Sequence, residues 1–496
     1  MGKEIVSHKF KAEDYQCFQQ RLLENLKGLK LMLAQPGFGL GSPSIGAELE
    51  LYLVDSSARP LLLNREVIER SGHQQLALEL NRFNLEFNLS PQEAKGTPFT
   101  HLENEMEFSI SLINQQLQNE KGCALPIGIL PTLKRSDFGL KTITDGSRFY
   151  ALTQALQKLR GRMFQIHIEG DSPLSLRSHD VSLEGANSSM QVHYRVNPDC
   201  FADTFNAFQM VTPLMVALAS NSAFMLGQPL WHETRVPLFR QTIDGRSNEE
   251  CSRGLPSRVC FGNGWVREGA YELFSEMAHL HKPILPICGE EDSLSVVANG
   301  GVAQLQELRM HSGSVWPWNR AVYDPQSGGH LRIELRALPA GPTSCDMAAN
   351  AAFFIGLAQG LSGSMTELIP TFPFSVLKND FYEAARKGLE AQLMWPDLDG
   401  HGGLQKRPAK EIALQLLSVA QQGLKQIDVD EPEISHYLGL IEERIVSGVT
   451  GAIWQRKEYQ RRLKNMSNAK AVTGMVQRYM GYSAENIPVA KWNTMS

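Results

Sequence analysis

The sequence lacks the short motifs that identify several large classes of enzyme. Its 496 residues contain no G-x-x-x-x-G-K-[ST] phosphate loop, no H-E-x-x-H zinc motif and no G-x-S-x-G nucleophile elbow. The seven cysteines are scattered and form no C-x-x-C pair, which indicates reduced thiols rather than a disulfide framework or a zinc site. If this protein binds ATP, metal ions held by carboxylates must position the nucleotide in place of a glycine-rich loop.

The chain also lacks a strong excess of either charge, an internal repeat and a long uninterrupted apolar run. The net charge is −5 and no run of lysines and arginines is present, so we expect no nucleic-acid partner. The start of the chain has no apolar core of the kind found in a secretory signal. The most apolar stretches, around 208–226 and 347–361, are interrupted by polar residues, and we expect buried helices there rather than membrane spans. These features favour a cytoplasmic protein without a membrane partner.

Four short segments alternate apolar and polar residues, and their polar positions carry acids, a histidine or an arginine. The segments are 45–53, 85–89, 190–196 and 331–337. Side chains alternate between the two faces of a strand, so strands that share a sheet would gather these charged groups on one face. That face would carry Glu48, Glu50, Glu86, His193, Glu334 and Arg336. Because so many acids repel one another unless cations lie among them, the pattern predicts a sheet that holds magnesium and a polyphosphate.

Predicted helices connect these strands and continue towards the end of the chain. We expect helices at 11–34, 98–118, 147–160, 201–226, 344–361 and 378–393, and a candidate fifth strand at 164–169. Strands separated by long helical connections predict an α+β fold. A turn-rich stretch at 397–408 suggests three regions: an N-terminal helical segment (1–40), a catalytic domain (41–397) and a helical C-terminal extension (398–496) that is weakly structured after Gly481.

The acid-bearing segments are similar to the ordered motifs of a known family. The strand that contains Gly46, Glu48 and Glu50 resembles the opening G-x-E-x-E strand of the glutamate–cysteine ligases, specifically of the bacterial carboxylate–amine ligase branch. Further resemblances follow in the family's order at 84–88, 189–194, 220–227, 234–235, 332–336 and 379–389. Each motif alone is short, and it is their shared order that makes the resemblance specific.

The resemblance implies a glutamine-synthetase-like fold, in which a curved, mainly antiparallel sheet flanked by helices holds ATP and metal ions on its concave face. It also implies an ATP- and Mg²⁺-dependent ligase that joins a carboxylate, typically the glutamate side chain, to an amine, typically cysteine, as in glutathione biosynthesis. The reaction would pass through an acyl phosphate. The partners would be small-molecule amino-acid substrates, and a homo-oligomer remains open.

The resemblance also suggests roles for individual residues. The expected metal ligands are Glu48, Glu50, Glu86 and Glu334, with Glu79 as a further candidate. The expected catalytic residues are Glu50 and Arg336, and the expected nucleotide contacts are His193, Glu334 and Arg336. A guanidinium fork matches phosphate oxygens, which suits Arg336 for the transferring phosphoryl group. Arg235 and Arg320 are the candidates for binding the substrate carboxylate.

Several alternatives stay open at this stage. Arg195 and Ala337 depart from the family's pattern, so the amine acceptor could differ from cysteine. A small-molecule kinase of the same fold would use the same acid face. Taken one strand at a time, Glu48 and Glu50 could be the solvated side of an antiparallel strand. The aromatic pair at 316–318 could stack on an adenine, although packing around a loop is favoured.

Overall fold

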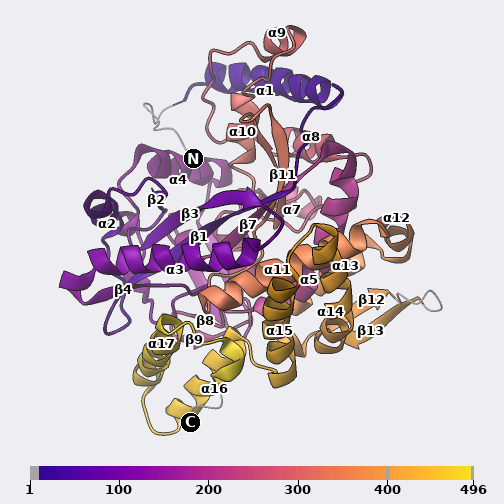
Figure 1. Cartoon of the computed structure of the whole chain (residues 1–496). Helices are drawn as coiled ribbons and strands as arrows, with labels where there is room; N and C mark the ends of the chain where they lie inside the picture. Colours follow the sequence, from indigo (N-terminus) through magenta and orange to yellow (C-terminus); the bar gives the residue numbers. More distant parts are fainter. Residues whose placement is uncertain (1–9, 172, 397–402, 493–496) are drawn as a thin grey trace.

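A curved antiparallel sheet lies at the centre of the chain (Figure 1). The computed structural model describes residues 10–171, 173–396 and 403–492. Within these residues seven strands form the sheet: β1 (Ser44–Asp55), β2 (Leu76–Leu78), β3 (Asn84–Glu93), β4 (Gly122–Leu125), β7 (Met190–Val196), β10 (Asn319–Asp324) and β11 (His330–Leu335). Their order is β10-β11-β7-β1-β3-β2, with β4 paired to the end of β1, and every pairing is antiparallel. The predicted α+β fold with a mainly antiparallel sheet is therefore confirmed.

The period-two pattern of the predicted strands decides which side chains share a face of this sheet. In β1, Glu48 and Glu50 alternate with fully buried leucines. Across the strand pairs, Glu50 stands opposite Glu86 of β3, and His193 of β7 stands opposite Glu334 of β11. Charged side chains of neighbouring strands therefore lie side by side on one face, as the alternation predicted.

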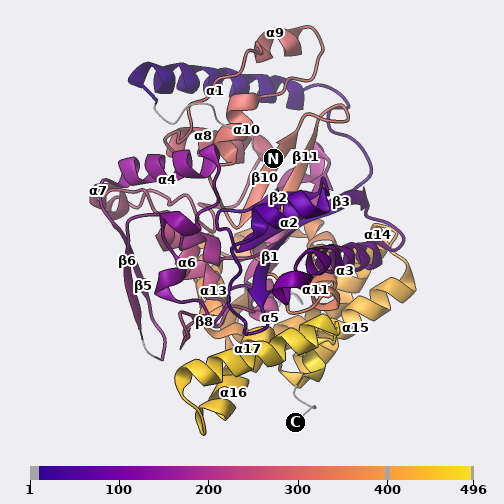
Figure 2. The same cartoon turned by 90° about the vertical axis from the view of Figure 1, so that its left-hand side faces the viewer.

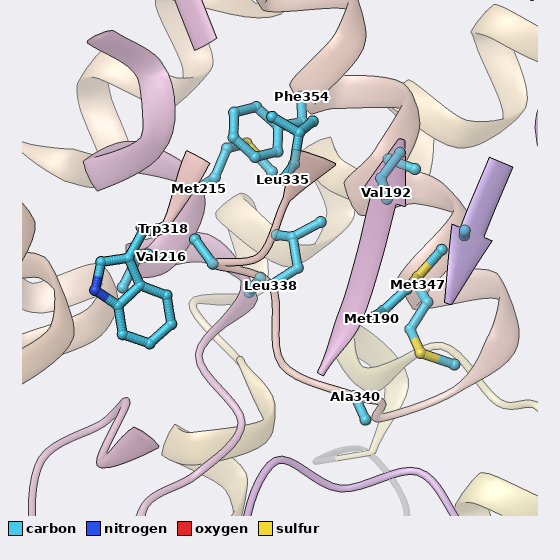
Figure 3. Close-up of a cluster of buried hydrophobic side chains, with 14 of the residues drawn as sticks. Met190, Val192, Met215, Val216, Trp318, Leu335, Leu338, Ala340, Met347 and Phe354 are labelled. Atoms are coloured by element: carbon cyan, nitrogen blue, oxygen red, sulfur yellow. The ribbon is translucent and has the colours of Figure 1, made fainter. Parts of the chain in front are cut away.

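Two almost uncharged helices cover the apolar face, α5 (Phe201–Ala219) and α11 (Ser344–Ser362). Each contains a single aspartate as its only charged residue, so it can be buried on every side. Figure 3 shows Val192 and Leu335 of the sheet in one cluster with Phe354 of α11. Burial of each such side chain contributes about 1.5–3 kcal/mol to folding. This layer supports the acid-bearing strands from behind.

The N-terminal helix α1 (Ala12–Leu33) packs against helices from the middle of the chain (Figure 1 and Figure 2). These helices are α8 (Ala270–Leu280), α9 (Ser293–Ala298) and α10 (Gln306–Ser312). Arg21 of α1 donates from Nε to the buried carboxylate of Glu307 at 2.9 Å. The N-terminal helix is thus attached beside β10, while a domain boundary at residue 40 stays a prediction.

Three of the other helices before residue 397 were predicted, two of them with shifted ends: α3 (Pro98–Gln116), α4 (Ser147–Arg160) and α13 (Phe374–Lys387). Four further helices of the described residues were not predicted: α2 (Asn64–Ser71), α6 (Arg235–Thr242), α7 (Asn248–Ser252) and α12 (Met365–Leu368). The helix predicted at 378–393 ends earlier, before Gly388, whose φ of 55° stops the helix. The helix predicted at 201–226 ends at Ala219, because the chain then forms the small hairpin of β8 (Phe224–Met225) and β9 (Gln228–Pro229).

The candidate fifth strand exists but lies outside the acid-bearing sheet. Residues 164–168 form β5 (Phe164–Ile168), which pairs with β6 (Leu174–Ser178) in a separate two-stranded hairpin. The alternation of this segment therefore indicated a strand correctly, but it could not indicate which sheet the strand joins. In the described part of the chain, every helix is too short or too polar to cross a membrane.

The C-terminal part consists, within the described residues, of a hairpin and four helices. They are β12 (Gln392–Pro396), β13 (Leu404–Pro408), α14 (Ala409–Gln426), α15 (Glu431–Ser447), α16 (Gly451–Leu463) and α17 (Asn468–Ala484). Helix α14 lies along α11, where the backbone of Gly423 contacts that of Gly356. Of the predicted boundary at 397–408, residues 397–402 lie outside the described residues, and a division at 398 stays a prediction.

The expectation of weak structure after Gly481 is wrong. Helix α17 continues to Ala484, and Trp492 is almost fully buried. Its ring packs edge-on against Trp454 of α16 and Tyr479 of α17, with ring centroids 4.9 and 5.0 Å apart. The region is polar overall, which led to the expectation of weak structure. A few aromatic residues nevertheless pack its end against the rest of the protein.

Candidate functional site

Two clusters of potential metal ligands lie on the polar face of the sheet. In each cluster, one ligand atom from every residue lies within 4.8 Å of the others. The β11 cluster consists of Glu48, His193 and Glu334, and the β3 cluster consists of Glu50, Glu79 and Glu86. Since Glu48 and Glu50 point the same way from one strand, the two clusters are neighbours on the sheet.

Positive side chains surround the β11 cluster. Arg320, which stands opposite Glu334 on β10, donates from Nε and Nη2 to its two carboxylate oxygens at 2.5 and 2.7 Å. Nη1 of Arg336 lies 3.4 Å from Glu334, and Nε2 of His193 lies 3.2 Å from Glu48. Burial raises the pKa of Glu334, but Arg320 and Arg336 outweigh it and hold that pKa well below its ordinary value. Burial likewise raises the pKa of Glu48, and His193 brings it below the ordinary value.

The β3 cluster has a different electrostatic environment. Among the described residues, the hydrogen bonds that its acids accept come from neutral donors, such as Ser189 N and Gln191 Nε2, both 2.8 Å from Glu50. Burial, helped by the charge of Glu79, raises the pKa of Glu50 to about 7. Burial and the neighbouring acids raise the pKa of Glu86 well above its ordinary value. A cation from outside the chain would relieve this crowding of acids.

Gln191 links the two clusters. Its Nε2 donates to Oε1 of Glu50, and its Oε1 accepts a hydrogen bond from Nη1 of Arg336. One amide thus orients the guanidinium of Arg336 between Glu334 and Glu50. Gln191 was not among the predicted site residues, although it lies two residues before His193 on the polar face of the same predicted strand.

The two arginines predicted to bind the substrate carboxylate are both engaged by protein groups. Arg320 holds Glu334 as described above. Arg235, at the start of α6, donates to the backbone carbonyl oxygens of Arg336 and Ala337 at 3.3 Å each. Contact of these arginines with a substrate stays a prediction. The structure gives them a further role, because one fixes a carboxylate of the β11 cluster and the other fixes the backbone after β11.

A further acid, the half-buried Glu184, was not among the predicted site residues. It lies in the short 3-10 turn that precedes β7. Burial, together with the charges of Glu79 and Glu50, raises its pKa to about 8. Strand periodicity cannot assign a loop residue to a face, so the only available signal was its position just upstream of the histidine strand.

Two residues that bear on the open alternatives have ordinary structural contacts. Trp318 is buried and packs against Phe239 and Phe381, so it belongs to the core, as the packing interpretation favoured. Arg195 donates from Nη2 to the carbonyl oxygen of Leu40 at 3.1 Å, where the chain enters β1.

The donors present on the polar face fit magnesium. Carboxylate oxygens are the ligands that Mg²⁺ prefers in proteins, and both clusters are rich in them. The buried His193 faces the acids of its cluster through Nε2, 3.2 Å from Glu48, while its Nδ1 has no hydrogen-bond partner among the described residues. The polar face can therefore hold divalent cations next to one another.

A protein-family model matches most of the chain. The model of glutamate–cysteine ligase family 2 matches residues 44–478. Among curated proteins, none matches the sequence.

The solved structures that are similar to this chain include two at low identity. One is the glutamate–cysteine ligase of Francisella tularensis in complex with AMP, at 13% identity and a TM-score of 0.47, covering 92% of this chain and 93% of that chain. The other is a bifunctional glutathione synthetase of Pasteurella multocida, at 12% identity and a TM-score of 0.45, covering 96% of this chain and 56% of that chain. Both likenesses are too distant to indicate a substrate.

Proposed function

Because the chain belongs to glutamate–cysteine ligase family 2, we propose that it is an ATP- and Mg²⁺-dependent ligase. It joins the side-chain carboxylate of glutamate to an amine, with cysteine as the first candidate, through an acyl phosphate. A carboxylate is a poor acyl donor, so phosphoryl transfer from ATP must precede attack by the amine. Such a transfer demands positioning and charge neutralisation rather than covalent chemistry by the protein.

The observation that supports this proposal most is the pair of adjacent ligand clusters on one sheet face. Each brings three potential ligands within 4.8 Å, and Arg336 lies between them, bound to Gln191. Two neighbouring cation sites and a guanidinium suit a polyphosphate better than a lone carboxylate or a neutral ligand.

The roles of the side chains follow from their charges. The β3 cluster and the β11 cluster would each hold a magnesium ion, and magnesium would neutralise the phosphates when bound. His193 would lie at the edge between metal and nucleotide. Arg336 would offer its planar fork to the transferring phosphoryl group, and Gln191 would keep that fork in place.

The test combines purified protein, Mg·ATP, glutamate and a panel of amines that includes cysteine, other amino acids and a polyamine. We expect ADP release that depends on glutamate and rises with one amine of the panel. When hydroxylamine replaces the amine, we expect it to trap the acyl phosphate as a hydroxamate.

Two results would contradict the proposal. If ADP and phosphate stay at background with every amine, the ligase assignment is wrong. If a stable phosphorylated product accumulates and no hydroxamate forms, the protein is a small-molecule kinase of the same fold.

A further inference from the structure

The segment 336–342 connects the acid-bearing sheet to helix α11 and begins with Arg336. Figure 3 shows it running from Leu335 past Leu338 and Ala340. Its backbone remains bonded to the start of β7, because Leu338 O accepts from Met190 N and Ala340 N donates to Ser188 O, both at 3.1 Å. The position of Arg336 is therefore coupled to the path of this segment.

Asn221 binds the same segment and connects it to the C-terminal helices. Its Nδ2 donates to Ala340 O and to the hydroxyl of Tyr479 in α17, both at 2.8 Å, and its Oδ1 accepts from Nε2 of Gln455 in α16 at 2.9 Å. The Tyr479 hydroxyl in turn donates to Pro126 O at 2.8 Å. Asn221, Gln455 and Tyr479 are all completely buried. Buried polar groups of this kind hold each other in one arrangement, because an unsatisfied group would cost free energy.

A second path leads from Asn221 to the backbone of Arg336. The backbone N–H of Asn221 donates to Oε2 of Glu233 at 3.0 Å, and Nη1 of Arg235 donates to Oε1 of Glu233 at 3.3 Å. Arg235 then donates to the carbonyl oxygens of Arg336 and Ala337. Asn221 is therefore connected to this segment at two places: directly at Ala340, and through Glu233 and Arg235 at Arg336.

We propose that Asn221, Gln455 and Tyr479 are positioning residues for Arg336, so that helices α16 and α17 form part of the working site. The Tyr479 hydroxyl packs directly on the segment, since a Cβ atom at Gly341 would lie 2.7 Å from its oxygen. Removal of this hydroxyl leaves a gap beside Gly341 and removes one of the two acceptors of Asn221 Nδ2, which lets the segment shift. A guanidinium displaced by about 1 Å loses about one hundredfold in rate when it must meet a transition state.

This inference rests on the proposed role of Arg336, and a matched pair of variants tests it. Tyr479→Phe removes the hydroxyl that contacts the segment. Tyr437→Phe removes a hydroxyl from the neighbouring helix α15, where it donates to Glu103 of α3 at 2.7 Å and not to the segment. Both rings are buried, so we expect similar small losses of thermal stability. We expect kcat to fall about tenfold or more in Tyr479→Phe with little change in the KM for ATP, and to stay at the wild-type value in Tyr437→Phe.

Gln455→Met provides a second variant in case Tyr479→Phe does not fold. It is nearly isosteric and removes only the hydrogen bonds to Asn221, so we expect the same fall in kcat. If wild-type protein turns over but the Tyr479 and Gln455 variants keep its kcat, the positioning role is wrong while the proposed function stands.

Crystal structures of wild type and Tyr479→Phe give a readout that does not need turnover. We expect the guanidinium of Arg336 to lose its contact with Gln191 in the variant. If Arg336 keeps this contact, the positioning role is overturned whatever the activity. If the wild type shows no ATP-dependent turnover, the proposed function fails, and the crystal comparison still decides whether the C-terminal helices position Arg336.

Discussion

The β11 cluster and the β3 cluster occupy the same face of one sheet, yet they carry opposite electrostatic environments. Arg320 and Arg336 lower the pKa of Glu334 against the effect of burial. In the β3 cluster, burial and neighbouring acids raise the pKa of Glu50 to about 7 and that of Glu86 well above its ordinary value. In the β11 cluster the effect of the arginines on the pKa values of the acids therefore dominates, whereas in the β3 cluster burial and repulsion between the acids dominate.

This difference suggests a division of labour. A carboxylate held by arginines is kept ionised and in a fixed orientation, so the β11 cluster is organised before any ligand arrives. Acids that share protons and repel one another gain most from a divalent cation, so the β3 cluster should respond most strongly to magnesium.

The largest expected effect is on catalysis. Glu50→Gln removes one acid from the β3 cluster, and we expect ADP release to fall by at least about one hundredfold. Because the change relieves repulsion between acids, we expect the melting temperature of the metal-free protein to stay level or to rise. Steady-state assays and thermal unfolding measure the two quantities.

Glu307→Gln is the matched control for that variant. Glu307 is a buried glutamate that pairs with Arg21 of α1 and lies outside the polar face. We expect it to lose thermal stability and to keep its turnover, the reverse of Glu50→Gln. A large fall in melting temperature for Glu50→Gln instead would identify Glu50 as a structural residue.

The second largest expected effect is a loss of stability when the β11 cluster is altered. Arg320→Gln removes the bidentate hydrogen bonds to Glu334 and leaves this carboxylate buried. We expect the free energy of unfolding to fall by about 3 kcal/mol. Arg332→Gln on the same pair of strands is the control, because Arg332 pairs with Asp324 nearer the surface at 3.1 Å. That change should alter the free energy of unfolding by less than about 1 kcal/mol. Equal losses in the two variants, measured by urea unfolding, would contradict the special position of Glu334.

The smallest expected effect is a dependence of the unfolding free energy on pH, which we expect magnesium to reduce. The folded-state pKa of Glu50, about 7, lies above its ordinary value of 4.5 because of burial and the charge of Glu79. Protonated Glu50 therefore contributes its full share of stability below pH 4.5, its ordinary pKa. This share is lost as the pH rises through about 7. We expect Mg²⁺ to raise the unfolding free energy by about 1–2 kcal/mol near pH 8 and to have little effect near pH 5.

Thermal unfolding in magnesium and in chelator, at both pH values, measures this difference. Glu50→Gln should show a smaller dependence on pH, since the titrating group is gone. A magnesium effect that is equal at the two pH values would place the ion away from the β3 cluster.

The parts of the site that follow strand periodicity were predictable from the sequence. Alternation over the four segments assigned Glu48, Glu50, Glu86, His193 and Glu334 to one face, and the strand registers confirm that they are neighbours. The α+β fold followed from the same segments and their helical connections. Local patterns carry this information because the side-chain period of a strand is fixed by its backbone.

The parts that depend on distant packing were not predictable. Glu184 lies in a turn, and the pairing of Arg320 with Glu334 needs the register of β10 on β11. The attachment of α1 beside α10 and the burial of Trp492 depend on contacts between residues hundreds of positions apart. No periodic pattern within a short segment records such contacts.

Strand β1 is paired with β3 along both of its glutamates and with β7 as far as Leu49, and Glu50 N also donates to Ser189 O just before β7 at 2.9 Å. A substitution there would remove a single ligand. Deletion of a single residue between 47 and 51 would instead exchange the two faces for all the following residues of the strand, so that leucines would lie on the polar face and carboxylates would lie against α5 and α11. Neither flanking strand can slip to compensate without losing its own partners. The spacing along this strand is therefore more vulnerable than the identity of any one of its side chains.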